Sequence, residues 1–319
     1  MEKASALRPA PAAIFAGTGY AKTMHVAVFG AAGFVGRALL RRLDQQGLAS
    51  TAIDVVPDPF GGSRPYVQAD VLDRPRIEQA LRGCNAVVHL AAHSLTASLA
   101  DPRTNAKVNV EGSLSIFDAA RAQGISRIVF SSASSLYGTP RYNPVDEEHS
   151  VDPQTPYGVA KFAVEQYLRV YERLFKIEPV VFRFFNVYGP GQTPQSGALI
   201  PVVLDKVRRG EPVTIFGDGS AARDFIFVED VAEMLVRAAT GPSRTGVYNL
   251  GTGRLATVQE VVDLCAKVAG RPAVVERKPP RPGEITNFSA DTRKLHKTFG
   301  ELPFLPLEEG LRRTAAAQP

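Results

Sequence analysis

The chain has 319 residues, of which 45% are hydrophobic and 22% charged, and its formal net charge at pH 7 is +5. This composition supplies enough apolar material for the core of one large domain or of two lobes, and no apolar run reaches the roughly 20 residues that a membrane span needs. The small net charge and the lack of a dense basic block argue against binding to nucleic acid.

The first segment, residues 1–23, lacks the continuous apolar block of a secretory signal. We therefore expect a flexible leader there, with Met24 as an alternative start. The two cysteines, Cys84 and Cys265, lie far apart in the sequence, and a chain of this length does not need a disulfide for stability. We expect two reduced, buried thiols and a cytoplasmic protein.

Short β-branched apolar runs alternate with longer segments whose apolar residues recur at helical spacing. This alternation is typical of an α/β fold of the Rossmann type, a doubly wound parallel sheet with helices on both faces. After Gly189 the pattern loosens into shorter elements with Pro/Gly-rich connections, which predicts a smaller C-terminal lobe. The predicted strands are 25–29, 51–56, 86–90, 127–131 and 179–185, and the predicted helices are 35–47, 109–124 and 155–175.

Three glycines, Gly30, Gly33 and Gly36, form a G-x-x-G-x-x-G array between the first predicted strand and the first predicted helix. In such an array the first glycine permits a tight turn, the second lets the backbone approach a pyrophosphate, and the third lets the helix pack on the strand. The pyrophosphate then lies on the amide groups and the positive dipole end of the helix. The glycines alone would also suit an ordinary turn, but the strand before them and the helix after them predict a dinucleotide site.

An acidic residue, Asp54, ends the second predicted strand, where its carboxylate can accept both ribose hydroxyls and would repel a 2′-phosphate. The sequence therefore predicts NAD rather than NADP as the cofactor, unless Asp54 is a plain turn residue. Asp70 and Val71 are placed to meet the adenine, although a solvated loop is nearly as good an interpretation of the acid. The other residues expected at the cofactor site are Phe34, Val35, Leu90, Ala91, Ala92 and Asn109. For Asn109, a structural hydrogen-bonding role is an equally good interpretation.

Tyr157 and Lys161 stand four residues apart in the third predicted helix, which Thr155 caps and Pro156 begins. This spacing brings the ammonium beside the phenol on one helix face. A neighbouring positive charge favours the phenolate, so a tyrosine with an ordinary pKa of about 10 could act as a base at neutral pH. Such a pair is common by chance, but after the glycine array and a serine-rich strand end it indicates a catalytic pair.

Several longer motifs carry a resemblance to a known family. They are HLAAHS, FRFFNVYGPGQ, IFGDGSAARDFIFVEDVA, YNLGTG and RPGEITNFSADTRKL. With these motifs the chain resembles, from about Met24 to about Phe299, the extended short-chain dehydrogenase/reductase family, and within it the nucleotide-sugar epimerases and dehydratases, with UDP-glucose 4-epimerase the most similar. The resemblance implies that NAD is held throughout the reaction and that Tyr157 is the catalytic base, supported by Lys161.

The resemblance also implies a substrate site. Asn186, Arg223 and Arg281 match residues that hold the nucleotide diphosphate, and guanidinium groups bind phosphate oxygens in bidentate fashion. A surface ion pair with Asp224 is the alternative for Arg223. Phe288 matches a residue that lines the sugar pocket, where a large side chain favours UDP-glucose, UDP-galactose or a uronic-acid counterpart over an N-acetylated sugar.

The serine-rich strand end departs from the family pattern. The family usually has a Ser or Thr four residues before the tyrosine of the YG pair, where it binds the reacting hydroxyl, and here that position holds Ala133. A shift of one residue would bring Ser134 there, so we expect Ser134 to be the catalytic hydroxyl and Ser132 to contact the substrate. Alternatively, the serines only satisfy backbone groups at the strand end. Members that eliminate water usually have an acid just after this hydroxyl, and Ser134 and Ser135 supply none.

These inferences predict NAD-dependent epimerisation at C4 of a nucleoside-diphosphate hexose, with a UDP- or dTDP-linked sugar as the substrate and a 4-ketose as the intermediate. A nucleotide-sugar dehydratase and a non-catalytic NAD-binding sensor are the alternatives. No metal is expected, because no ligand cluster accompanies His89 and His93.

The expected organisation follows from the same resemblance. The NAD-binding domain is predicted at 24–187 and 224–250, and the nucleotide-sugar-binding lobe at 188–223 and 251–319. A homodimer is expected through the helices 109–123 and 156–175, which match a pair that usually forms a four-helix bundle between two subunits.

Overall fold

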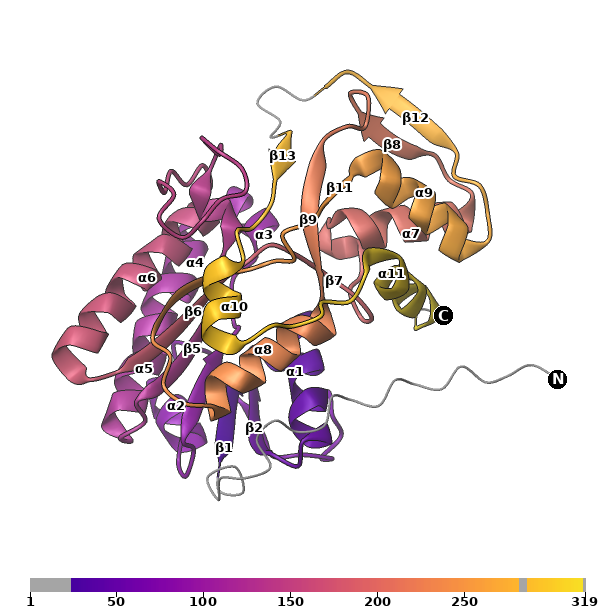
Figure 1. Cartoon of the computed structure of the whole chain (residues 1–319). Coiled ribbons are helices and arrows are strands. Elements are labelled where there is room, and N and C mark those ends of the chain that lie inside the picture. Colours follow the sequence, from indigo (N-terminus) through magenta and orange to yellow (C-terminus); the bar gives the residue numbers. More distant parts are fainter. Residues whose placement is uncertain (1–23, 281–285, 318–319) are drawn as a thin grey trace.

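The computed structural model describes residues 24–280 and 286–317. A parallel sheet of seven strands lies at the centre of the larger lobe, in the order β10-β6-β5-β4-β1-β2-β3 (Figure 1). All five predicted strands belong to this sheet, and β3 and β10 are additional strands that the sequence patterns do not predict. The strands are β1 (His25–Phe29), β2 (Ala49–Asp54), β3 (Tyr66–Gln68), β4 (Ala86–His89), β5 (Arg127–Ala133), β6 (Glu178–Phe184) and β10 (Gly246–Leu250).

The strand order reverses at β1, which pairs with β2 on one side and with β4 on the other. A crevice opens at the carboxyl ends of the strands at such a point. Helices cover both faces of the sheet, so the predicted doubly wound Rossmann-type fold is confirmed. One face carries α1 (Phe34–Gln45), α8 (Val228–Thr240) and α10 (Arg293–Phe299), and the other carries α2 (Arg74–Ala80), α5 (Gly112–Ala122) and α6 (Pro156–Phe175).

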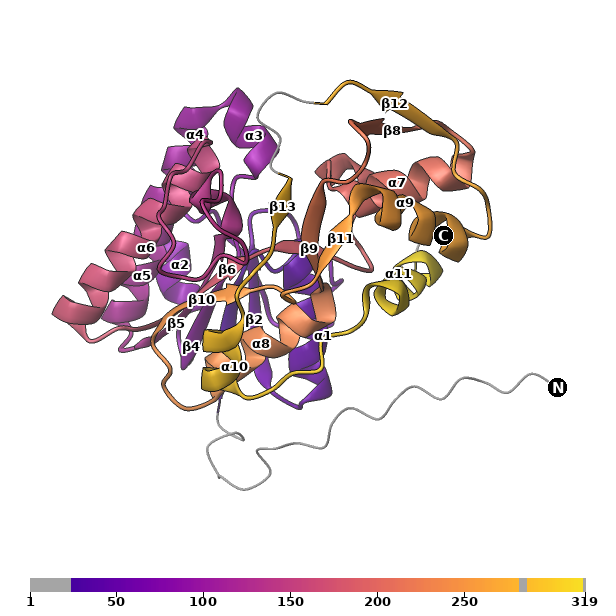
Figure 2. The same cartoon turned by 45° about the horizontal axis from the view of Figure 1, so that its top comes forward.

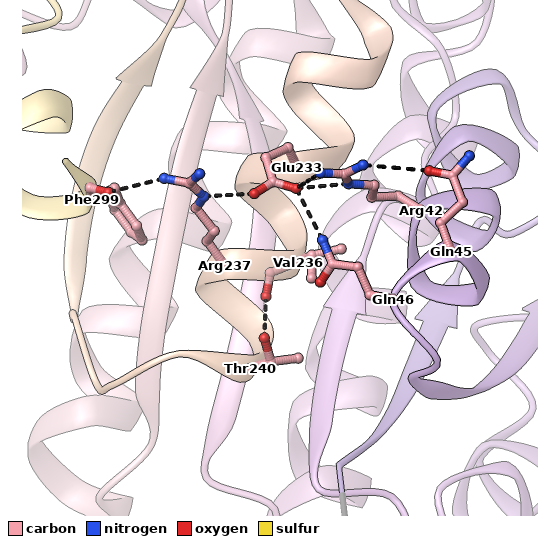
Figure 3. A network of polar contacts seen from close by, with 8 residues as sticks. All are labelled: Arg42, Gln45, Gln46, Glu233, Val236, Arg237, Thr240 and Phe299. Atoms are coloured by element: carbon pink, nitrogen blue, oxygen red, sulfur yellow. Dashed lines mark hydrogen bonds and ion pairs between the residues drawn. The ribbon is translucent and has the colours of Figure 1, made fainter. Parts of the chain in front are cut away.

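The helices α1 and α8 are joined by apolar and polar contacts. Leu39, Leu43 and Met234 are fully buried in one apolar cluster between these helices and the sheet. At the outer surface the Glu233 carboxylate accepts hydrogen bonds from Nε of Arg42 and from Nε of Arg237, each at 2.7 Å (Figure 3). This network lies away from the carboxyl ends of the strands.

The segment before α5 is more irregular than the single predicted helix 109–124. Two short helices, α3 (Leu95–Ala100) and α4 (Pro102–Ala106), come first, and the π-helical turn Lys107–Glu111 then leads into α5. A wide turn of this kind often occurs at a functional site, because it changes the direction of the side chains that it carries. Asn109 lies in this turn and is 2% exposed.

The smaller lobe holds two further sheets. Its four-stranded sheet has the order β11-β9-β13 with β7 paired to β9, and a second sheet pairs β12 with β8. In both views β13 lies between the two lobes (Figures 1 and 2). The elements are β7 (Asn186–Tyr188), α7 (Leu199–Arg209), β8 (Val213–Phe216), β9 (Ala222–Phe227), β11 (Leu255–Thr257), α9 (Val258–Ala269), β12 (Val275–Lys278), β13 (Asn287–Phe288) and α11 (Leu307–Ala316).

The predicted domain boundaries at 187/188 and 223/224 fall inside β7 and β9, which pair with each other. The division of the chain into two domains therefore stays a prediction whose boundaries cut one sheet. Across residues 24–280 and 286–317, none of the helices combines the length and the apolar character that a membrane crossing requires.

Candidate active site

A cavity of about 600 Å³ is lined by the carboxyl ends of β5 and β6 and by the facing elements of the smaller lobe. Six of the predicted site residues meet in its wall: Val35, Leu90, Ser132, Tyr157, Asn186 and Arg223. The other lining residues are Leu95, Ser131, Ala133, Phe184, Phe185, Val187, Tyr188, Gln192, Ala198, Leu199, Ile200, Phe225 and Val258.

The glycine array forms a cradle at the start of α1. Gly30 has a φ of +77°, and a Cβ there would lie 2.6 Å from the backbone nitrogen of Ala91. A Cβ at Gly36 would overlap the carbonyl oxygen of Gly30, so this glycine lets the helix pack on the turn. Gly33 is different, because it is exposed and its Cβ would meet only the Gly30 carbonyl oxygen, at 3.2 Å. The open side of Gly33, at the N-terminus of α1, is where a pyrophosphate can approach the amides.

Asp54 ends β2 beside this cradle. Its Oδ2 accepts a hydrogen bond from the backbone N–H of Ala32 at 2.9 Å, and its Oδ1 accepts one from Val55 at 2.8 Å. These bonds fix the carboxylate next to the glycine turn, while its remaining lone pairs can accept from two hydroxyl groups. The position suits the two ribose hydroxyls of a dinucleotide.

The remaining predicted cofactor residues differ in their surroundings. Asp70 is exposed and accepts a hydrogen bond from the Leu72 N–H at 2.9 Å. Val71 is 8% exposed, and its side chain packs against Gly112. Asn109 holds the loop after β4, because its Oδ1 accepts from the His93 N–H at 2.7 Å and its Nδ2 donates to the His93 carbonyl at 3.0 Å. Asn109 therefore has a structural role in fixing the backbone of His93, and its contact with the cofactor stays a prediction.

Tyr157 and Lys161 lie on the first two turns of α6, whose start is capped by Thr155 as predicted. The Lys161 Nζ donates to the carbonyl of Ser131 at 2.7 Å and lies 5.4 Å from the centre of the Tyr157 ring. Burial raises the pKa of Tyr157 to about 12. Burial also lowers the pKa of Lys161 to about 7, against the opposing charge of Glu165. The Tyr157 hydroxyl makes no hydrogen bond within the described part of the chain and lines the cavity.

The predicted substrate residues lie on β7, β9 and β13. The side-chain amide of Asn186 donates to the carbonyl of Asp224 at 2.8 Å, and Nη1 of Arg223 donates to the carbonyl of Ala222 at 2.9 Å. Both side chains line the cavity on the side of the smaller lobe. Arg281 lies outside the described residues.

A family model described as "NAD dependent epimerase/dehydratase family" matches residues 26–251. The chain belongs to this family. It is 34% identical to UDP-glucose 4-epimerase from Mycolicibacterium smegmatis, over 91% of this chain and 97% of that protein. Among solved structures it is similar to UDP-glucose 4-epimerase with UDP-glucose from Thermotoga maritima, with a TM-score of 0.85, 31% identity and coverage of 92% of this chain and 98% of the other. It is also similar to MoeE5 in complex with UDP-glucuronic acid and NAD, with a TM-score of 0.84, 32% identity and the same coverage.

Within the epimerase/dehydratase fold, the serine-rich strand end takes a specific course. Ala133 is the last residue of β5 and lines the cavity, whereas Ser134 begins a 3₁₀ turn and is not part of the cavity wall. The chain turns after Ala133, so Ser134 lies outside the cavity wall, and its role as the catalytic hydroxyl stays a prediction. Ser131 donates to the His89 carbonyl at 3.0 Å and Ser132 donates to Glu165 at 2.5 Å, so neither hydroxyl proton is free for a substrate.

Phe288 also takes a position that the family resemblance does not predict. It is 7% exposed, does not line the cavity, and packs against the ring of Phe185 with a centroid distance of 5.1 Å. Pairing of β13 with β9 sets Phe288 opposite Arg223 and directs its ring into a buried cluster with Tyr137. Of these two stacked rings, Phe185 lines the cavity and Phe288 lies behind it.

The sequence patterns do not identify the apolar cavity residues Phe185, Val187, Leu199 and Phe225. Their only sequence signal is their place at the ends or starts of elements, since apolar residues there look the same as core residues. No group of three or more His, Cys, Asp or Glu side chains within the described ranges is arranged to hold a metal ion.

Proposed function

We propose that the chain catalyses the NAD-dependent epimerisation at C4 of a nucleoside-diphosphate hexose, either UDP-glucose and UDP-galactose or a UDP-uronic acid, through a transient 4-keto sugar. The observation that carries this proposal is the Tyr157 hydroxyl, which faces the cavity with the Lys161 ammonium one turn away. The similarity to epimerases that bind UDP-sugars supports it.

NAD fits the residues at the glycine array. The open side of Gly33 and the amides at the start of α1 suit the pyrophosphate, and Asp54 suits a ribose with two free hydroxyls. Bound NAD would take a hydride from C4 of the sugar and return it to the other face of the same carbon. The lining residues Val35 and Leu90 would then lie on the cofactor side of the cavity.

The chain's own residues supply the proton chemistry and the anchor. Tyr157 takes the proton from the O4 hydroxyl and later returns it, while Lys161 favours its phenolate form. Asn186, Arg223 and Arg281 are proposed to hold the diphosphate, so that the sugar can turn over without leaving. With Ala133 in the cavity wall, Tyr157 carries out the proton transfer without a second hydroxyl.

The cavity favours epimerisation over dehydration. Elimination of water needs a second acid or base besides the tyrosine, and no Asp or Glu is found among the described residues that line the cavity. Epimerisation needs only one base and one hydride acceptor. Tyr157 and Lys161 are both present and adjacent, which argues against a non-catalytic sensor.

Product analysis tests the proposed function. The enzyme is incubated with UDP-galactose, UDP-glucuronic acid and the dTDP-linked hexoses, and the products are identified by NMR and mass spectrometry. An epimer keeps the mass of the substrate, whereas a dehydration product loses one water. Loss of water from any of these sugars, with no epimer formed, would establish the dehydratase instead.

Asp54→Ala is expected to weaken NAD binding about tenfold and to bring the NADP affinity closer to the NAD affinity, because the carboxylate both accepts the ribose hydroxyls and repels a 2′-phosphate. Fluorescence titrations with both cofactors measure this change. Asp58→Ala is the control, since its carboxylate accepts hydrogen bonds from Phe60 and Gly62 within its own loop. An unchanged ratio of the NAD and NADP affinities in Asp54→Ala would show that the ribose does not bind at Asp54.

We also propose that the enzyme is a cytoplasmic homodimer. The location is supported by the free, buried thiols of Cys84 and Cys265. The dimer is supported by one face of α6, on which Val159, Tyr167 and Leu174 are 53%, 43% and 67% exposed at helical spacing. Two such helices from each of two subunits could bury these side chains together with α5.

Tyr167→Glu is expected to weaken the dimer by about 30-fold or more, because a charge would be buried at the centre of the apolar face. Sedimentation velocity over a range of concentrations measures the dissociation. Val274→Glu changes a side chain of similar exposure, 53%, in the smaller lobe and is expected to leave the dimer intact. Equal dissociation of both variants, or of neither, would contradict the proposed interface.

A further inference from the structure

A buried ion pair lies about two helical turns along α6 from Tyr157, the proposed base. Glu165 of α6 and Arg183 of β6 have side chains that are 0% and 2% exposed, and Nη2 of the arginine lies 2.7 Å from Oε2 of the glutamate. Nε of the arginine donates a second hydrogen bond to Oε1 at 3.1 Å. Two charges at this depth are costly to bury even when they are paired, so fold stability alone does not explain them.

The ion pair is connected to the active site on two sides. Ser132, which lines the cavity and pairs with Arg183 in the sheet register, donates its hydroxyl proton to Oε1 of Glu165 at 2.5 Å. On α6 the glutamate follows Lys161 by four residues, so the carboxylate and the ammonium occupy one helix face. The carboxylate is thus fixed by hydrogen bonds one helical turn from the lysine.

Burial acts against the chemistry proposed for the Tyr157 and Lys161 pair. A phenolate base needs a charged lysine beside it, but burial lowers the pKa of Lys161 to about 7 and raises the pKa of Tyr157 to about 12. The ammonium has the Ser131 carbonyl at 2.7 Å and the Phe130 ring at 4.6 Å as close neighbours, and neither carries a negative charge. The negative group that opposes the burial of Lys161 is Glu165.

We propose that Glu165 is a positioning residue for the epimerisation, because its fixed, buried carboxylate holds Lys161 in the ammonium form that Tyr157 needs to act as a base. Glu165 does not touch the substrate and acts only through the lysine. The inference rests on the proposed function and adds that Glu165 determines the pH range over which the enzyme turns over.

The charged groups that face Lys161 determine the sign of the effect. His89 of β4 is close, but burial lowers its pKa to about 3, so it stays neutral above that pH. Tyr157 and Glu165 come from α6, and Arg183 of β6 is the countercharge of the glutamate. Removing the carboxylate takes away an attraction and leaves a buried guanidinium that repels the ammonium. Both changes lower the pKa of Lys161.

The test compares Glu165→Gln with Arg183→Met in the full-length enzyme loaded with NAD. Glu165→Gln is expected to shift the alkaline fall of kcat/KM for UDP-galactose to lower pH by about one unit or more, because Lys161 loses its proton earlier. Arg183→Met is expected to shift it to higher pH, because the carboxylate then acts on the lysine without its countercharge. A merely structural ion pair would lower the melting temperature in both variants and leave both pH profiles unchanged.

A spectroscopic titration gives a second readout that needs no turnover. Tyrosinate absorbance is followed against pH in the unmodified enzyme and in Glu165→Gln, and from each is subtracted the titration of the same protein with Tyr157→Phe added. The Tyr157 phenol is expected to ionise at higher pH in Glu165→Gln. If the unmodified enzyme does not convert UDP-galactose, the proposed function fails, and this titration still decides the role of Glu165.

Each single variant leaves a buried charge unpaired and can fail to fold. The double variant E165Q/R183M removes both charges and is expected to fold. Its alkaline fall of kcat/KM is expected to shift to lower pH by less than that of Glu165→Gln. Glu233→Gln is the matched control, because it breaks the ion pairs with Arg42 and Arg237 outside the cavity and is expected to leave the pH profile unchanged (Figure 3). An unshifted profile in the double variant, or shifts of the same sign in both single variants, would overturn the proposal.

Discussion

Tyr157→Phe is expected to lower kcat by about three orders of magnitude while NAD content and UDP binding change by less than about twofold. The substitution removes only the hydroxyl that faces the cavity without a hydrogen-bond partner in the described residues. The effect is large because no neighbour can replace this hydroxyl: Ala133 has none, and the protons of Ser131 and Ser132 are donated elsewhere. Initial rates with UDP-galactose, together with the absorbance of the bound cofactor, measure both quantities.

Tyr171→Phe provides the control for this substitution on the same helix. Its hydroxyl donates to Oδ1 of Asp118 at 2.9 Å, at the opposite end of α6 from the cavity. We expect a small loss of stability and an unchanged kcat. A Tyr157→Phe enzyme that keeps more than about a tenth of the activity would show that another group accepts the proton, and would end the assignment of the base.

The parts of the fold that are encoded locally could be predicted from the sequence. The strands β1, β4 and β5 are short apolar runs between helical patterns. Each strand is buried on both faces of the sheet, so its continuous apolar run is enough to predict it. β3 has three residues and β10 begins at Gly246, so neither gives a clear pattern. β10 pairs with β6, which lies more than sixty residues earlier in the chain. Such pairing depends on tertiary contacts that the sequence does not reveal.

The candidate site could be predicted where one element carries the chemistry. The glycine array, Asp54 and the pair of Tyr157 and Lys161 each belong to one turn, strand end or helix face, and the structure has them there. Ser134 and Phe288 depend instead on the direction of the chain after a strand and on packing between lobes. The contact of Glu165 with Arg183 joins a helix and a strand 18 residues apart, and its partner Ser132 comes from a third element. Spacing alone cannot identify such long-range contacts.

The second large effect is expected at the glycine cradle, where two neighbouring glycines have different functions. Gly36→Ala is expected to lower the free energy of unfolding by about 3 kcal/mol, because the new Cβ would overlap the carbonyl oxygen of Gly30 and would lie 2.8 Å from the Cα of Ala31. Both contacts are with backbone, which cannot move without separating α1 from the sheet. Urea denaturation of the enzyme without added NAD measures this loss.

Gly33→Ala is expected to have the opposite pattern: the free energy of unfolding changes by less than about 1 kcal/mol, while NAD affinity falls about tenfold or more. Gly33 has a φ of −70° and a ψ of 171°, an extended conformation that alanine adopts without strain. The new Cβ has one close neighbour, the Gly30 carbonyl oxygen at 3.2 Å, and otherwise enters the space where the pyrophosphate would meet the first amides of α1. If Gly33→Ala bound NAD normally, the pyrophosphate would have to lie elsewhere. If it unfolded as readily as Gly36→Ala, both glycines would be packing residues, and the helix start would lose its role as the cofactor cradle.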